Sequence, residues 1–234
     1  MNALAARETK PRGGPPHAAL AVVFAAAVAL VIVLTGPLLL FAPPVVSFMQ
    51  ARHAVADRLA VGEAAVDRAT TAMLRDLVVG GDFTVSLDGR RPVLDAAERS
   101  HMQDVGVVVR SLAAVEAVSL GVVLLAGRHL VAHRRLRARV LQIAALSVGG
   151  LAALAGVTFV VAFDVAFTAF HLVFFPGGNW QFPPSSNLIR FFPEPMWYEL
   201  AMVAGVAIVI SALIVLILAR RDASQAHAPR GARA

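Results

Sequence analysis

The chain has 234 residues, of which 58% are apolar and 15% are charged, and it contains no cysteine. Soluble domains are usually about 45–50% apolar and about 25% charged, so this composition excludes a disordered or a disulfide-stapled protein. The absence of cysteine also excludes a thiol nucleophile, a thioester intermediate and a Cys-ligated zinc ion. The net charge of +6 would suit nucleic-acid binding, but the placement of the cations favours a membrane topology instead.

Four long apolar runs predict an all-α membrane protein with four transmembrane helices. About 20 apolar residues are needed to cross a hydrocarbon core of about 30 Å, and four runs reach this length. The last run opens with the pair Trp197-Tyr198, as expected at a membrane interface. A soluble helical core with four such runs would have no polar face to present to water.

The arginines predict the orientation. Residues 128–139 contain five arginines and no acid, whereas Arg190 is the one cation in residues 168–196. Both tails are basic, so both termini and the middle connection are expected in the cytoplasm, where anionic lipids attract cations. The predicted segments, in chain order, are a cytoplasmic tail (1–17), span 1 (18–42), an extracytoplasmic cap (43–103), span 2 (104–127), a cytoplasmic loop (128–139), span 3 (140–167), an extracytoplasmic loop (168–196), span 4 (197–219) and a cytoplasmic tail (220–234).

The cap is predicted to contain an amphipathic helix and a short hairpin. Apolar side chains recur there at steps of four and seven residues, at Val55, Leu59, Val66, Met73 and Leu77. Gly80-Gly81 should end this helix, and residues 84–94 around Asp88-Gly89 have the pattern of a hairpin.

Two histidines are candidates for proton transfer. His101 precedes the second predicted span and His171 follows the third, so both imidazoles can lie at one depth near the outer face. Each has an acid on the same helical side, Asp104 for His101 and Asp164 for His171. A carboxylate beside an imidazole fixes its tautomer and increases its basicity, which suits proton transfer. From the spacing alone, two interfacial histidines with structural hydrogen bonds remain the alternative.

Charged residues inside the spans are costly and are expected to be paired or functional. Arg110 and Asp164 each lie near the outer surface and could pair across helices. Glu116 lies near the middle of the second span, where a protonated carboxyl bonded to a neighbouring helix is expected.

Two segments of the chain carry distinctive motifs. Residues 98–105 read ERSHMQDV, which fits the pattern E-x-x-H-M-x-D-V. Residues 164–197 contain the run F-x-x-F-H-x-x-F-F, then W-x-F, then L-I and F-P before an aromatic. Together these motifs resemble the signature of the bacterial lipoprotein intramolecular transacylase (Lit) family. The four-span layout and the long first outer loop also agree. The chain departs from the pattern at residues 176–179, which read PGGN where the family usually has Asn and an acid, and at Asn187, where an acid is more usual.

The resemblance implies an acyl transfer within one substrate molecule, a diacylated bacterial lipoprotein at the plasma membrane. The acyl chain at the sn-2 position of an S-diacylglyceryl cysteine would move to the cysteine's own α-amino group, giving a lyso-form lipoprotein. The site would face the extracytoplasmic side, among membrane lipids, and the family implies no cofactor, no metal and no nucleic-acid partner.

The resemblance also implies roles for particular residues. His101 and His171 would be the catalytic pair, with His171 as the base. The supporting residues would be Asp104, Asp164 and Arg110. The substrate would contact Trp180, Phe182, Phe170, Phe174, Phe175 and Asn179.

Other classes of function remain open. A non-enzymatic membrane partner would use the cap to dock another protein. A zinc enzyme would use His101, His171 and Asp104 as ligands, although no HExxH-like spacing supports it. A transporter is disfavoured because Gly149-Gly150 is the one glycine or proline break near a midplane and no internal repeat is visible.

Overall fold

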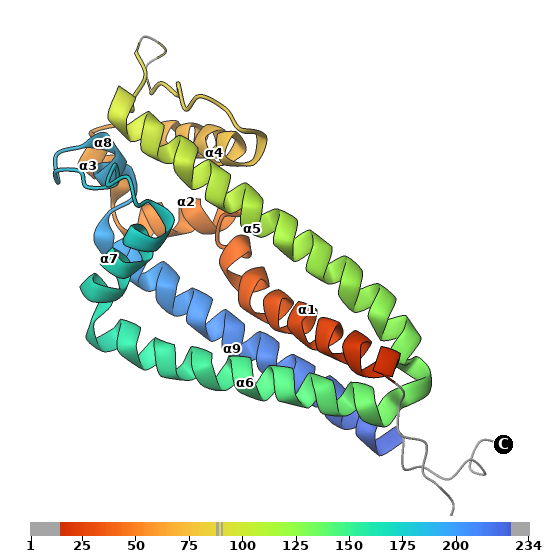
Figure 1. Ribbon diagram of the computed structural model, residues 1–234. Helices are drawn as coiled ribbons and strands as arrows, with labels where there is room; N and C mark the ends of the chain where they lie inside the picture. Colours follow the sequence, from red (N-terminus) through yellow and green to blue (C-terminus); the bar gives the residue numbers. More distant parts are fainter. Residues whose placement is uncertain (1–14, 88, 90, 226–234) are drawn as a thin grey trace, which may run out of the picture.

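The computed structural model describes residues 15–87, 89 and 91–225, and the regular structure in these residues is entirely helical. The helices are α1 (Pro15–Leu39), α2 (Pro43–Arg52), α3 (Val55–Leu59), α4 (Glu63–Val79), α5 (Ala96–His129), the 3₁₀ helix η1 (Leu130–His133), α6 (Arg134–Val161), α7 (Phe163–Phe174), α8 (Asn187–Phe191) and α9 (Glu194–Gln225). The long helices α1, α5, α6 and α9 form an elongated bundle, and the short helices gather at one end of it (Figure 1). From here on the cap means this end of the structure, which consists of α2, α3 and α4 from the predicted cap and of α8 from the predicted extracytoplasmic loop.

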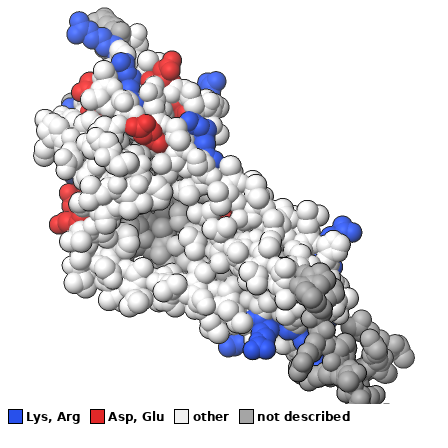
Figure 2. All heavy atoms as spheres, viewed as in Figure 1, with Lys and Arg blue, Asp and Glu red and all other residues white. Residues whose placement is uncertain are grey.

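Three stretches of described helix are long and apolar enough to cross a membrane: Ala18–Leu39, Ala96–Val161 and Glu194–Gln225. The second stretch contains both α5 and α6, because the chain reverses direction at η1 (Figure 1). Large apolar side chains such as Leu124 and Val161 point outward from the bundle. Figure 2 shows a broad uncharged belt between two charged ends. Such a belt is stable in lipid and not in water, so the protein is a membrane protein.

The bundle is held together by close contacts between helices. Helix α1 packs against α5, α6 and α9, and α6 packs along α9. At Gly36 the backbone of α1 approaches α9 so closely that an added Cβ would lie 2.7 Å from the Cβ of Ala207. Glu116 on α5 lies 2.6 Å from the Thr35 hydroxyl of α1, so its carboxyl bonds to a neighbouring helix as expected. Small residues and interhelical hydrogen bonds of this kind are typical of helix packing in membranes.

The cap has its own apolar core, and the predicted periodic residues Val55, Leu59, Val66, Met73 and Leu77 are all buried in it. The predicted single helix is nevertheless two helices, α3 and α4. The backbone at Ala60 is left-handed (φ 53°), so α3 ends there and the chain turns before α4 begins.

The predicted hairpin at residues 84–94 is wrong: its described residues contain no strand, and one backbone bond joins the two arms, from Val93 N–H to the Val85 carbonyl (2.8 Å). Asp88 and Arg90 lie outside the described residues. An isolated two-stranded hairpin is marginally stable. The segment is held instead by Phe83, which is fully buried in the cap core.

Two helix bounds differ from the predicted spans. Helix α5 begins at Ala96, so His101 lies inside it rather than before it. Helix α6 ends at Val161, and Ala162 (φ −140°, ψ 51°) breaks the chain before α7 begins. His171 therefore belongs to a separate short helix, α7, at the same end of the bundle as the cap (Figure 1).

Candidate active site

A cavity of about 1300 Å³ opens beneath the cap and extends between the long helices. Its wall is almost entirely apolar, and Figure 2 shows a hollow in the uncharged belt. Six of its described lining residues have a side chain that can form hydrogen bonds: His101, His171, Trp180, Gln181, Glu194 and Trp197. A large apolar cavity with a few polar groups at one end is typical of a binding site for a lipid-like ligand.

The two candidate histidines meet in this cavity. The ring centroids of His101 and His171 are 6.2 Å apart, with an angle of 27° between the ring planes. His101 comes from the second turn of α5 and is 6% exposed, whereas His171 comes from α7 and is partly exposed. Two imidazoles this close can act on a single substrate group.

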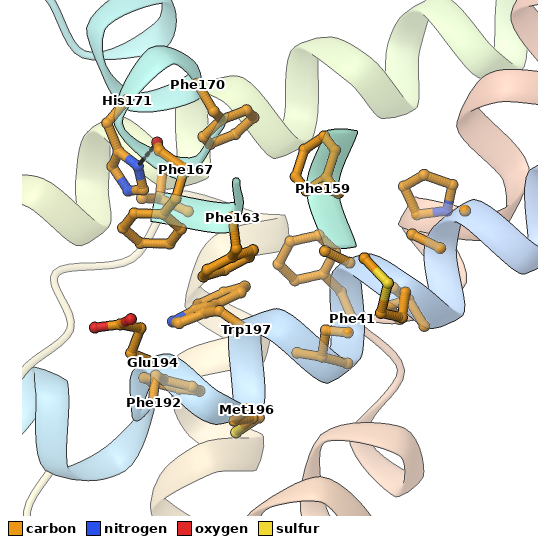
Figure 3. Close-up of a pocket in the computed structure, with 18 of the residues that line it drawn as sticks. Phe41, Phe159, Phe163, Phe167, Phe170, His171, Phe192, Glu194, Met196 and Trp197 are labelled. Atoms are coloured by element: carbon orange, nitrogen blue, oxygen red, sulfur yellow. Dashed lines mark hydrogen bonds between the residues drawn. The ribbon is translucent and has the colours of Figure 1, made fainter. Parts of the chain in front are cut away.

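The surroundings of His171 fix its tautomer. Its Nδ1 lies 2.8 Å from the Phe167 carbonyl oxygen, which can only accept a hydrogen bond (Figure 3). Nδ1 therefore carries the proton, and Nε2 keeps a lone pair that can accept one. Burial lowers the pKa of His171 below its ordinary value of 6.5, while the bond to Phe167 opposes this shift. His171 is thus mainly neutral at pH 7.

Aromatic rings enclose the pair. Trp180 packs against His171 with its ring tilted by 34°, at a centroid distance of 4.7 Å. Phe175 meets His101 edge-on at 4.9 Å, and Phe182 lies 5.7 Å from the same ring. Of the predicted substrate-contacting residues, Trp180, Phe182, Phe170 and Phe175 line the cavity, whereas Phe174 and Asn179 lie outside its lining.

The three predicted supporting residues do not surround the histidines as expected. Asp104 is exposed and accepts a hydrogen bond from Asn179 (2.6 Å) in the loop after α7, and no hydrogen bond joins it to His101. Asp164 is exposed, and no hydrogen bond or ion pair joins it to another described residue. The break at Ala162 separates α7 from α6, and the Phe167 carbonyl takes the place expected for a carboxylate beside His171.

Arg110 also lies away from the reacting end of the cavity. Its guanidinium donates to the Leu77 carbonyl (2.8 Å) at the end of α4. The predicted pair with Asp164 is therefore absent from the described residues. Arg110 stabilises the junction between the cap and α5, because a cation at a helix C-terminus meets unpaired carbonyl groups.

The buried carboxylate of Glu98, which was not among the predicted site residues, fixes the position of the helix that carries His101. Glu98 is 2% exposed, and its two oxygens accept hydrogen bonds from the backbone N–H groups of Leu188 (2.9 Å) and Asp95 (2.7 Å). Asp95 accepts in return from the Glu98 N–H (2.8 Å), which completes a capping box. Glu98 therefore fixes the start of α5, which carries His101, against α8. The spacing D-x-x-E before an apolar run was the sequence signal for this cap.

The described residues contain no group of three or more His, Asp or Glu side chains that could hold a metal ion. The zinc alternative, with His101, His171 and Asp104 as ligands, therefore gains no support from the geometry.

The family comparison and the solved structures indicate the same family. The family model "Lipoprotein intramolecular transacylase Lit" matches residues 22–197, more than half of the chain. No curated protein sequence matches significantly. The solved structure of the membrane-integral Lit from Bacillus cereus is similar, with a TM-score of 0.77, 15% identity, and coverage of 90% of this chain and 97% of that chain.

Two further structures of the Bacillus cereus protein carry a substitution of one histidine. The arginine variant and the alanine variant each match with a TM-score of 0.74 and 14% identity, over 90% of this chain and 93% and 95% of theirs. At these identities the structures show a shared fold, whereas the family model shows the relationship. The chain belongs to the lipoprotein intramolecular transacylase Lit family.

Proposed function

We propose that the protein moves the sn-2 acyl chain of an S-diacylglyceryl cysteine to the α-amino group of the same cysteine. Family membership supports a lipoprotein substrate. The observation that carries the proposal is the facing pair of His101 and His171, 6.2 Å apart at the polar end of an apolar cavity.

The proposed chemistry needs one base and one proton donor. The free α-amine has a pKa near 8 and attacks the ester carbonyl carbon only in its neutral form. As the new C–N bond forms, His171 Nε2 takes the proton that nitrogen loses, because Nδ1 is already protonated. The C–O bond to the sn-2 oxygen then breaks, and that oxygen gains the proton that His171 took, passed on through His101, so both imidazoles end neutral. One ester is lost, one amide forms, and a hydroxyl is left on glycerol.

The cavity suits the rest of the substrate. From the histidines it continues between the long helices, past Leu34, Val109, Gly156 and Gly205. An apolar channel of this kind would hold acyl chains while the ester and amine remain at the polar end. Amine and ester belong to one molecule, so the enzyme has mainly to orient them, which is worth several kcal/mol (roughly 7–11 at most).

We further propose a four-span topology with both termini in the cytoplasm, so that the cap and the site face the extracytoplasmic side. At the end of the bundle opposite the cap, Arg137 forms a two-pronged pair with Asp222 (2.6 Å for each bond). This pair joins α6 to α9 within the basic region that the positive-inside rule assigns to the cytoplasm.

Mass spectrometry of a lipoprotein N-terminus, from cells with and without the protein, tests the function. We expect an N-acylated cysteine with a mono-acyl glycerol only where the protein is present. A diacylglyceryl cysteine with a free amine in both samples would refute the transacylase function.

A further inference from the structure

The polar end of the cavity is negatively charged. Glu194 is the one carboxylate among the described lining residues, and no Lys or Arg is among them. Glu194 is exposed, and no hydrogen bond or ion pair joins it to another described residue. An unpaired carboxylate at a cavity wall attracts a cation that enters the cavity, and solvent limits the strength of such a pair.

Aromatic contacts join the start of α9, where Glu194 lies, to α7, which carries His171. Glu194 lies in the first turn of α9, four residues before Tyr198 and so on the same side of that helix. Tyr198 meets Phe163 of α7 edge-on at 5.3 Å. Along α7, Phe163 lies 5.5 Å from Phe167, and Phe167 lies 4.2 Å from His171. Figure 3 shows the Glu194 side chain extending toward this aromatic row.

We propose that Glu194 binds the α-ammonium group of the substrate's N-terminal cysteine and brings it beside His171. This inference rests on the proposed transacylase function. The ammonium group is the one cation at the reacting end of such a substrate, because its diacylglyceryl part is neutral. The carboxylate favours the protonated amine, so the bound ammonium, whose ordinary pKa is about 8, must give one proton to water before the neutral amine attacks the ester.

Glu194 would also distinguish substrate from product. Acyl transfer converts the amine into a neutral amide, so the product no longer has a positive charge for the carboxylate to bind. Glu194 is therefore a positioning residue that favours the entry of free-amine lipoproteins and the release of N-acylated ones.

Binding of two matched lipopeptides to the purified full-length protein tests this role. Both probes carry a neutral peptide and an ether in place of the sn-2 ester, which prevents turnover; one has a free α-amine and the other is N-acetylated. We expect the wild type to bind the free amine about fivefold more tightly, the upper range for a solvent-accessible charge pair. Glu194→Gln should bring the ratio of dissociation constants close to one without weakening the acetylated probe.

Glu199→Gln is the matched control, because Glu199 lies on the same helix but pairs with Arg52 outside the cavity (2.8 Å). This control should keep the wild-type ratio. A wild type without preference, or a Glu194→Gln variant that keeps it, overturns the role of Glu194. Turnover of the ester substrate by the wild type is measured in parallel, and its absence would overturn the proposed function instead.

Discussion

His101 and His171 differ in what surrounds their ring nitrogens. His171 has an acceptor for Nδ1 and an Nε2 that remains available, whereas Nδ1 of His101 is buried without a hydrogen-bond partner among the described residues. Phe175 and Phe182 pack against the His101 ring. The asymmetry supports His171 as the base and His101 as the group that passes the proton on.

The pH profile of kcat/KM should show two breaks. The substrate amine gives the first, near its pKa of about 8, because only the neutral amine attacks. His171 gives the second, because protonation removes the base, and its lowered pKa places this break below pH 6.5. As the pH is lowered, log(kcat/KM) should therefore fall with a slope of one between the breaks and a slope of two below the second break. A second break at or above pH 6.5 would contradict the burial of His171.

Alanine substitutions test whether the histidines act as one unit. His101→Ala and His171→Ala should each lower kcat by roughly 10²–10⁴-fold, the usual contribution of acid–base catalysis. The double variant should be scarcely worse than either single variant, because members of one catalytic unit are strongly non-additive. His129→Ala is the control, since His129 is exposed at the far end of α5. Multiplicative losses in the double variant would show that the two rings act independently.

At the scale of helices, the position of His101 depends on how the start of α5 is fixed to α8. Glu98→Ala would leave the backbone N–H groups of Leu188 and Asp95 without acceptors in a buried environment. We expect a loss of about 3 kcal/mol in the free energy of unfolding, the range for buried hydrogen bonds to a charged group. Thermal unfolding in detergent measures it. Glu63→Ala, in the exposed first turn of α4, should change stability by less than about 1 kcal/mol. Equal effects of the two substitutions would contradict the role of Glu98.

The sequence predicts some elements better than others for physical reasons. The apolar period of the cap correctly predicts which side chains are buried, because burial depends on helical spacing. The break at Ala162 gives no signal, because residues 159–163 are all apolar and contain no glycine or proline. That break moves Asp164 out of the region where spacing placed it.

At the scale of the whole molecule, the uncharged belt and the two charged ends fit the proposed topology (Figure 2). Cysteine labelling with an impermeant reagent tests it, because the natural chain has no cysteine and gives no background. In intact cells, Ser185→Cys should react and Arg134→Cys should not, since residues 168–196 are expected outside and 128–139 inside. The opposite pattern would invert the topology and place the site on the cytoplasmic side.

The site itself was only partly predictable. His101 and His171 are separated by 69 positions in the chain, yet the ends of two helices bring their rings together, and their depth was readable from the hydrophobic runs. The bond from Glu98 to α8 could not be predicted in the same way, because α8 reaches Glu98 through tertiary folding rather than through spacing along one helix. The approach of α7 to the start of α9, where Glu194 lies, is likewise a tertiary contact.

Intramolecular acyl transfer by the purified protein is most directly measured with a mixture of two isotopically labelled lipopeptides. One carries a deuterated sn-2 acyl chain and an unlabelled peptide, and the other carries an unlabelled chain and a ¹³C-labelled peptide. Every N-acylated product should keep the chain of its own peptide, and His171→Ala should form no product above background. Products that combine the deuterated chain with the ¹³C-labelled peptide, or full turnover by His171→Ala, would contradict intramolecular transfer at this histidine pair.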